Sequence, residues 1–511
     1  MDVIFWGAMV RMSQALLAAC PTIIVGWLVA AIFERILGRN GTLQLFGGHT
    51  WRQLPQAWLL GMLLPVCSLG VIPIMLQMRK SGIAGGTILA FGLTAPLFNP
   101  ISVLYGLTLS DPFAIFVFCM GSLTIVTVMG VLWDWLFPGN WIEAEELTKT
   151  PYGAKRIVAV ALSVCEQAFS RSTGYMLLAI VGVGALSAIL PAGVLQRAAN
   201  KHDMLAPLTM AGVSTLAYVT PMVAIVQVAS MFQHGNSIGA SFTLLVLGTG
   251  VNLGLLCWIV RHYGFTRSLI WIGCLLIVVL AISYGVDGPL FPKGVEPADH
   301  THAFDTYCNP YLESTENMLS SSIRLIRDAW KPEEIVAGVF ALVLLSIGGW
   351  LRYIDPNGTW MKKLVTPSDQ SQLAKPQRDI VLPNWVIAFV CFVGLISASV
   401  GGCFLYYPPT SEIRREMAAI DAELFSACAG KKWDEAEFWI PIQEDWAHKL
   451  TVSCYLRGTK LSRFQKTLMK VFLNKLEMLE HAVEDRDFEE VNKWKREASV
   501  SLSRLRRSFD K

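Results

Sequence analysis

The chain has 511 residues, of which 53% are hydrophobic and only 16% are charged, and its mean hydropathy is +0.47. Because soluble domains usually carry about a quarter charged residues, this composition excludes an ordinary soluble protein. The formal net charge of +3 gives no basis for binding nucleic acid, and we predict none as a partner. The apolar residues lie in runs of about 20, the length that a helix needs to cross a bilayer. The sequence therefore predicts an all-α, polytopic transmembrane bundle with the lipid bilayer around it.

Ten apolar runs predict transmembrane segments. In chain order these cover 14–33, 57–78, 83–109, 112–136, 174–195, 207–232, 236–260, 268–285, 334–353 and 385–406. The neighbouring pairs 57–78/83–109 and 207–232/236–260 leave full spans and re-entrant segments as two alternatives. Lysine and arginine occur at both ends of the second run, so the positive-inside rule leaves the orientation open.

These segments divide the chain into six parts. They are a first four-helix unit (1–136), a connecting loop (137–173), a second four-helix unit (174–285), a polar loop with an interfacial helix (286–333), two additional transmembrane helices (334–406) and a soluble helical tail (407–511). The interfacial helix is predicted from the helical spacing of Leu319, Ile323 and Ile326. In the tail, we expect Trp433, Trp439 and Trp446 to pack a small helical bundle or to rest on lipid headgroups.

The two four-helix units resemble each other when the chain is shifted by 153 residues. The shift pairs Gly82 with Gly235, Gly86 with Gly239, Asn99 with Asn252, Val66 with Val219, Ile72 with Ile225 and Met78 with Met231. The first glycine permits the positive φ of a tight helical hairpin, and the second lets two backbones approach closely. We predict an internal repeat, as is typical of transporters. By the number of segments, we expect the two units to be parallel.

Two stretches of the first unit, 65–73 and 94–100, combine prolines with polar side chains inside apolar runs. Each proline frees a backbone carbonyl, and unwound backbone is tolerated at this depth only where it is buried in protein or lines a wet cavity. We therefore predict a substrate path at the interface of the repeats, and Cys67, Asn99 and Asn252 should border one central cavity. A kinked helix without a ligand is the alternative. The predicted path residues are Cys67, Ser68, Pro73, Thr94, Pro96, Asn99, Pro100, Thr220 and Asn252.

A second candidate site lies in the polar loop, where His300 and His302 precede Cys308. Imidazole and thiolate suit zinc or copper, and alternation would put both histidines on one side of an extended chain. The spacing matches no established zinc motif, so an ordinary polar loop is the alternative. Most of the 11 cysteines lie inside apolar runs, where a thiol packs as a small hydrophobe.

Three classes of protein fit a chain of this kind: a permease, a membrane-embedded enzyme and a membrane scaffold that displays the tail. An enzyme should bring paired ionisable groups into its helices, and the repeated units contain none. The nucleotide-binding signature G-x-x-x-x-G-K-[ST] is also missing. We predict a permease for a small solute or ion, not an enzyme, without a cofactor. A scaffold is the alternative, and assembly into a homo-oligomer stays open.

The string PVCSLGVIPIMLQMRKSGIAGGTILAFGLTAPLFNP, residues 65–100, resembles the signature of the predicted-permease family that includes the organoarsenical (methylarsenite) efflux permeases. The resemblance covers about residues 10–285. It implies an eight-helix permease of the bacterial inner (plasma) membrane, with Cys67, Asn99 and Pro100 on the transport path. The arsenical exporters carry a second cysteine where this chain has Leu69. This departure removes support for arsenical efflux itself but not for a permease, so we expect a small solute or ion, with a metalloid or metal species as one candidate.

Overall fold

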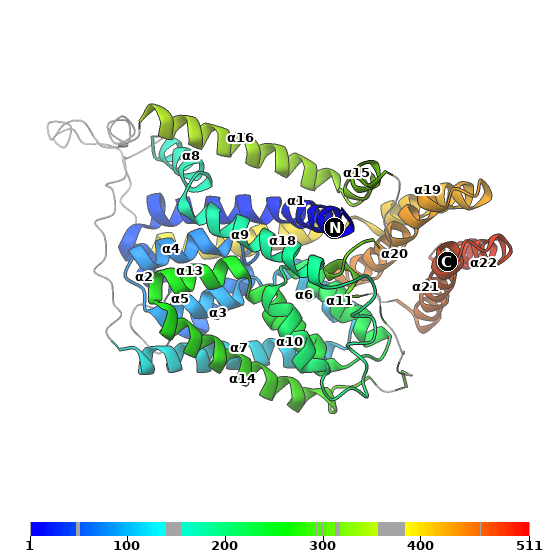
Figure 1. The fold of residues 1–511 in the computed structure, drawn as a ribbon, viewed down its shortest axis with the longest axis horizontal. Coiled ribbons are helices and arrows are strands. Elements are labelled where there is room, and N and C mark those ends of the chain that lie inside the picture. Colours follow the sequence, from blue (N-terminus) through cyan, green and yellow to red (C-terminus); the bar gives the residue numbers. More distant parts are fainter. Residues whose placement is uncertain are drawn as a thin grey trace. The chain divides into compact units, whose positions relative to one another are not determined.

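The computed structural model describes residues 2–46, 52–138, 155–292, 294–295, 297, 301, 303–311, 317–355, 384–459 and 461–509. All regular secondary structure in these residues is helical, as predicted (Figure 1). The chain separates into two compact units. Unit 1 comprises Met1–Val103 and Ser110–Ser399, and unit 2 comprises Leu104–Leu109 and Val400–Lys511.

Six helices in the described residues are long and apolar enough to cross a membrane, which marks an integral membrane protein. They are α1 (Asp2–Ile32) with its continuation to Leu45 through η1 (Phe33–Leu37) and α2 (Gly38–Leu45), α7 (Pro112–Leu136), α9 (Arg171–Ile189), α14 (Phe265–Asp287), α16 (Pro332–Ile354) and the Phe389–Tyr406 part of α18 (Asn384–Tyr406). A bent helix pair brings the number to seven at most. The expectation of ten spans is therefore wrong as a set of continuous helices.

The four remaining runs are each broken into two short helices. They form α3 (Gln53–Leu63) and α4 (Val71–Lys80), α5 (Gly85–Thr94) and α6 (Pro100–Leu109), α10 (Ala206–Leu216) and α11 (Pro221–Gln233), and α12 (Ile238–Thr243) with η2 (Leu244–Gly248) and α13 (Leu253–Tyr263). The last pair is bent by 55° at its break. All four breaks lie at proline, glycine or polar residues, where the helical hydrogen-bond ladder is interrupted.

The first of these pairs enters the fold and returns to the end from which it came. Leu54, at the start of α3, and Gly86, at the start of α5, both pack against Gly130 of α7. At the far ends of the same helices, Gly61 packs against the backbone of Ala95. Helix α3 therefore runs parallel to α5, and α4, which connects them, must run back. This geometry is that of a re-entrant hairpin, one of the two alternatives left open by the sequence.

The second four-helix unit, residues 174–285, contains a matching hairpin of α10 and α11. Near the start of α10, the Met204 carbonyl accepts a hydrogen bond of 2.9 Å from the Tyr284 hydroxyl. The start of α12 lies at the same end, because Gly239 packs against the Ser283 carbonyl. At the opposite end, Ser214 packs against Gly248. Helix α10 is therefore parallel to α12, and α11 returns.

Helices α7 and α14, which a shift of 153 residues superimposes in the sequence, run in opposite directions. Gly121, early in α7, packs against Ile282, late in α14, and the Arg267 guanidinium near the start of α14 lies 5.6 Å from the Phe137 ring centroid. Figure 1 shows the two helices along each other. The expectation that the two four-helix units are parallel is wrong. A hairpin that returns to its starting end does not cross the membrane, so each four-helix unit crosses three times instead of four.

The polar segment after α14 packs onto the start of α1. Arg11 donates hydrogen bonds to the backbone carbonyls of Asp305 (2.6 Å) and Cys308 (2.9 Å), next to the short helix η3 (Asp305–Tyr307). Helix α15 (Met318–Asp328) follows and buries Met318 against Tyr311 and Val10. Leu319 and Ile323 of α15 are exposed, and the interfacial location of this helix stays a prediction.

Unit 2 contains the helical tail. Helices α19 (Thr410–Ala429), α20 (Trp433–Leu456), α21 (Arg463–Glu484) and α22 (Phe488–Arg507) enclose an apolar core that includes Met417, Ile440, Phe472 and Leu502. Trp433, Trp439 and Trp446 pack against this core, which is one of the two arrangements that we expected. The last residues of α6 belong to the same unit, and the Tyr105 hydroxyl lies 2.9 Å from His448 Nδ1 of α20.

Candidate functional site

The break between α3 and α4 carries Cys67 and Ser68, both fully buried. Thr22 of α1 donates a hydrogen bond of 2.8 Å to the Cys67 sulfur. Gly26 of α1 and Gly70 of the break touch through their backbones, and a side chain at either position would collide with the other segment. The Tyr218 hydroxyl, from the break between α10 and α11, lies beside the same sulfur. The Cys67 thiol is therefore held between α1, the α3–α4 break and the α10–α11 break.

The prolines of the predicted path occupy different helical positions. Pro73 is the third residue of α4, where the missing amide hydrogen is not needed, so it does not unwind that helix. The unwound residues 64–70 precede it and include Pro65. Pro100 begins α6, and Pro96 lies in the break before it. The Thr94 hydroxyl, at the end of α5, donates to the Ala90 carbonyl at 2.7 Å.

Asn99 and Asn252 each cap a helix in its own four-helix unit. The Asn99 Oδ1 accepts a hydrogen bond of 2.7 Å from the Ser102 amide, and the Asn252 Oδ1 accepts one of 2.8 Å from the Leu255 amide. Both side chains are buried, so they face the protein interior as expected. Each asparagine caps the helix that follows its break. The buried Asn252 Nδ2 has no hydrogen-bond partner among the described residues.

The helix breaks of the first and second four-helix units approach one another. Gly250, in the break before α13, packs against the Leu93 carbonyl and Leu97, at the break after α5. Within the second unit, the Val219 amide donates to the Gly248 carbonyl at 3.2 Å, and Thr220 caps α11 by accepting a hydrogen bond of 3.4 Å from the Val223 amide. The broken segments thus converge inside unit 1. That Cys67, Asn99 and Asn252 border one cavity stays a prediction.

Two aspartates that the sequence analysis did not single out hold the starts of α5 and α12 in place. Asp134 accepts a hydrogen bond of 3.0 Å from the Gly86 amide, and Asp287 accepts one of 2.7 Å from the Gly239 amide. Both aspartates, like both glycines, are separated by 153 residues. The turn glycines Gly82 and Gly235 have φ values of 82° and 63°, as predicted for tight hairpins. The sequence shift itself was the signal that could have identified the aspartates.

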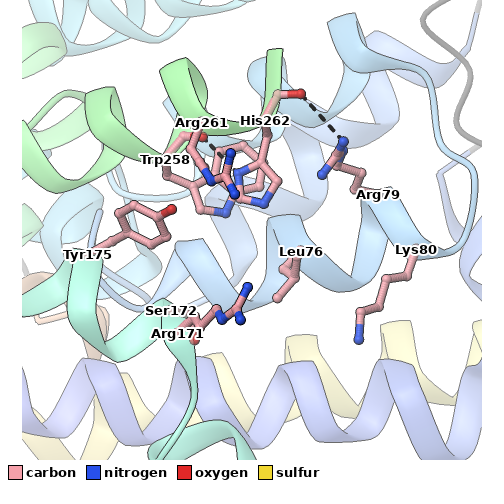
Figure 2. A pocket seen from close by; sticks show the side chains of 9 residues that line it. All are labelled: Leu76, Arg79, Lys80, Arg171, Ser172, Tyr175, Trp258, Arg261 and His262. Atoms are coloured by element: carbon pink, nitrogen blue, oxygen red, sulfur yellow. Dashed lines mark hydrogen bonds between the residues drawn. The ribbon is translucent and has the colours of Figure 1, made fainter. Parts of the chain in front are cut away.

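A cavity of about 540 Å³ lies at the end of the fold where α4 and α13 end and α9 begins (Figure 2). None of the predicted path residues lines it. The lining carries cationic side chains from three separate segments and no carboxylate. It consists of Leu76, Arg79, Lys80, Arg171, Ser172, Tyr175, Trp258, Arg261 and His262.

Comparison with known proteins assigns a family. The family model ArsP_1, described as a predicted permease, matches residues 6–287, more than half of the chain. The chain belongs to this predicted permease family. The UPF0718 protein YcgR of Bacillus subtilis (strain 168) is 24% identical over 283 residues, which are 53% of this chain and 94% of the relative. No solved structure gives a significant match.

Membership of the predicted permease family implies a transporter in a lipid bilayer rather than an enzyme. The match ends with α14, so α16, α18 and the helical tail lie outside the matched region. The matched region therefore contains both four-helix units and all of the predicted path residues.

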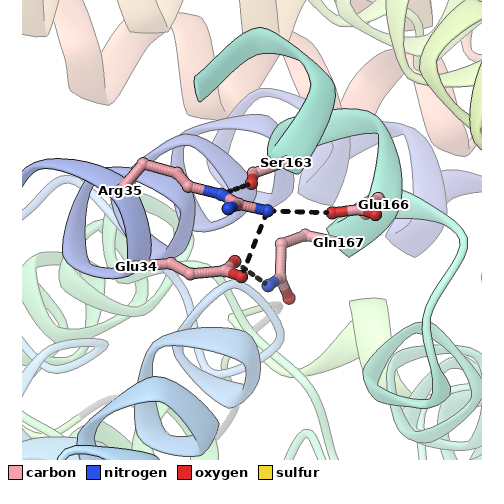
Figure 3. Close-up of polar contacts among 5 residues, drawn as sticks. All are labelled: Glu34, Arg35, Ser163, Glu166 and Gln167. Atoms are coloured by element: carbon pink, nitrogen blue, oxygen red, sulfur yellow. Dashed lines mark hydrogen bonds and ion pairs between the residues drawn. The ribbon is translucent and has the colours of Figure 1, made fainter. Parts of the chain in front are cut away.

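At the same end of the permease as the cavity, Arg35 of η1 is buried among polar groups of α8 (Lys155–Ala168) (Figure 3). It donates to the Ser163 hydroxyl at 2.6 Å and lies 3.6 Å from the carboxylates of Glu34 and Glu166. Gln167 also donates to Glu34, at 3.2 Å. A buried arginine with two carboxylates and a hydroxyl is fully engaged, so this cluster fixes α8 against the end of α1.

The predicted metal site is only partly within the described residues. His300 and His302 lie outside them, and Cys308 is buried. Burial raises the pKa of the Cys308 thiol, which disfavours the thiolate that a metal would need. The described residues contain no group of three or more metal-binding side chains. Metal binding by His300, His302 and Cys308 stays a prediction.

Proposed function

We propose that this protein is a permease whose solute path passes through the broken segments at the centre of unit 1. The observation that carries the proposal is the convergence of backbone breaks from both halves in a buried, apolar region. Backbone that leaves the helical ladder at membrane depth exposes amide and carbonyl groups, which suit the coordination of a solute or ion. The path residues are those named from the sequence: Cys67, Ser68, Pro73, Thr94, Pro96, Asn99, Pro100, Thr220 and Asn252.

The path lies between two inverted repeats in this proposal. Three observations support the repeat: the elements of the two halves occur in the same order at an offset of 153 residues, Asp134 and Asp287 make the same hydrogen bond, and Asn99 and Asn252 make the same cap. The antiparallel α7 and α14 support inversion. Inverted repeats allow one gate to open while its equivalent closes, which is the basis of alternating access.

The solute in this proposal is a small solute or soft ion that leaves a bacterial cell through the inner membrane. The Leu69 position lacks the second thiol that a trivalent metalloid prefers. Cys20 of α1, however, lies near enough to Cys67 for their charged forms to interact. In this proposal, Cys20 supplies the second thiol from a segment other than the turn that carries Cys67.

Transport by the purified full chain in proteoliposomes tests the proposal. Uptake and efflux would be screened with methylated and inorganic arsenicals, soft metal ions and small anions. We expect Asn99→Ala and Asn252→Ala to reduce transport at least tenfold, because each leaves the first turn of a broken helix uncapped beside the path. Unchanged transport in both variants would contradict a path through the breaks.

The solute class is tested by a cysteine series. Loss of transport in Cys20→Ser and Cys67→Ser, with native rates in Cys274→Ser as the matched control in α14, would establish a thiol-binding solute. Native rates in all three would establish a path without thiolate chemistry. If the native chain moves no solute, the alternative function is a membrane scaffold that displays the helical tail.

A further inference from the structure

The cavity of Figure 2 brings together cations that are far apart in the chain. Arg79 and Lys80 form the last residues of α4, Arg171 begins α9, and Arg261 lies near the end of α13 with His262 beside it. Arg171 and Arg261 are exposed and make no ion pair within the described part of the chain. Four permanent positive charges therefore surround a space of about 540 Å³.

No carboxylate lines the cavity, and one acidic group, Glu166, interacts with its Lys80. Glu166 also lies 3.6 Å from the buried Arg35. Arg79 and Lys80 have further partners, whereas Arg171 and Arg261 make no ion pair within the described residues, so two guanidinium groups remain unbalanced around a lining without carboxylates. Like charges that share one lining repel each other, and an anion bound between them would relieve this repulsion.

The fold itself does not require these cations. At the offset of 153 residues, Arg79 and Lys80 correspond to Phe232 and Gln233. In the same way, Arg261 and His262 correspond to Thr108 and Leu109. Since α11 and α6 end with these uncharged residues, a helix end of this fold forms without positive charge. The charge at one end is thus an addition to the common architecture.

Two further features of the lining suit an anion with several oxygen atoms. Helix α9 begins at the cavity with Arg171 and Ser172, so its amide groups and the positive end of its dipole add to the cations. Trp258 lines the cavity while only 1% of its surface is exposed, and its indole N–H has no hydrogen-bond partner within the described residues. Guanidinium groups bind phosphate oxygens in pairs, with planar geometry.

We propose that this cavity is a binding site for a phosphate group, separate from the solute path, held by Arg171, Arg261 and Arg79 with the Trp258 indole as a further donor. The cavity lies where membrane helices end, so the phosphate can come from an anionic lipid headgroup or from solution. This inference does not depend on transport.

Binding to the purified full chain in neutral detergent tests the site. One arm titrates inorganic phosphate or pyrophosphate against chloride at equal ionic strength, and the other adds phosphatidylglycerol against phosphatidylcholine. The readouts are the thermal unfolding midpoint and, for lipid, retention of the bound molecule in native mass spectrometry. We expect saturable binding in at least one arm, and the arm that saturates identifies the source of the phosphate.

Single substitutions connect binding to the cavity. Arg171→Gln and Arg261→Gln should each weaken binding about tenfold, the value of a charge-assisted hydrogen bond. Arg197→Gln, an exposed arginine far from the lining in sequence, should bind as the native chain does. Arg171→Lys and Arg261→Lys keep the charge and provide folded variants if the glutamine forms are unstable. Absence of saturable binding in both arms, or equal binding in the cavity variants and Arg197→Gln, would overturn the proposal.

Discussion

At the scale of single residues, two glycine–aspartate pairs fix the starts of α5 and α12 against α7 and α14. The Gly86 and Gly239 amides donate to Asp134 and Asp287, while the same glycines lie directly against the carbonyls of Gly130 and Ser283. Only a residue without a side chain permits both contacts at once. The glycine therefore serves as a packing surface and as a hydrogen-bond donor.

We expect Gly86→Ala and Gly239→Ala each to destabilise the protein by about 1–3 kcal/mol, because the added methyl group would overlap a backbone carbonyl that cannot move alone. Gly273→Ala in α14 is the matched control, since nothing lies within 4 Å of its added methyl group. That control should be neutral or slightly stabilising. Thermal unfolding in detergent measures all three, and equal midpoints for Gly86→Ala and Gly273→Ala would contradict the close contact.

The sequence predicted many of these residues and missed others for a definite reason. Gly82, Gly86 and Asn99 were identified because glycine and asparagine have specific backbone roles that recur at the offset of 153 residues. The partners Asp134 and Asp287 lie 48 residues after Gly86 and Gly239, and no local pattern connects them to these glycines. Cysteines inside apolar runs, Cys20 among them, are predicted from the sequence to be packing residues, because the interaction of Cys20 with Cys67 depends on tertiary structure.

At the scale of helices, the sequence predicted the apolar runs but not their breaks. Periodicity and composition cannot distinguish a span of about 20 residues from two short helices with a polar break between them. The difference depends on which neighbour each half packs against. For α3 and α4, that information lies in the contacts of Gly61 and Leu54 with α5 and α7.

Helix α20 provides a prediction at the same scale. His448 is buried, with its Nδ1 2.9 Å from the Tyr105 hydroxyl and its Nε2 3.9 Å from Glu444. Burial lowers the pKa of His448 to about 4, although Asp445 opposes this shift. Because the unfolded chain binds the proton near pH 6.5, stability is fully present above that pH and is lost as pH falls toward 4.

Between pH 7 and pH 5, this linkage should cost the native chain about 2 kcal/mol of unfolding free energy. The His448→Gln variant should show a decrease that is smaller by about this amount, since glutamine does not titrate. Unfolding midpoints measured at half-unit pH intervals compare the two chains. Other titrating groups are common to both, so identical pH profiles would show that His448 is not buried in its neutral form.

At the scale of the whole membrane part, the α3/α4 hairpin allows the positive-inside rule to predict the orientation, which the sequence alone left open. A full span over residues 57–78 would place lysine and arginine on both sides of the membrane. Because α4 returns to the end where α3 starts, both sets of charges lie on one side. The same end also holds Arg35, Arg171 and Arg261.

The positive-inside rule then predicts that this basic end faces the cytoplasm. Helix α16 runs toward it, since Gly338 packs against Leu17 of α1 and Gly348 packs against Cys165 of α8. One further crossing by α18 should carry residues 407–511 to the opposite side. We expect a reporter fused after residue 511 to be active as alkaline phosphatase and dark as green fluorescent protein.

The same reporters fused after Ile354, at the end of α16, provide the matched control and should behave in the opposite way. If both fusions report the reverse pattern, the basic end faces outward and the positive-inside argument is wrong for this protein. If the two fusion points report the same side, α18 does not cross the membrane.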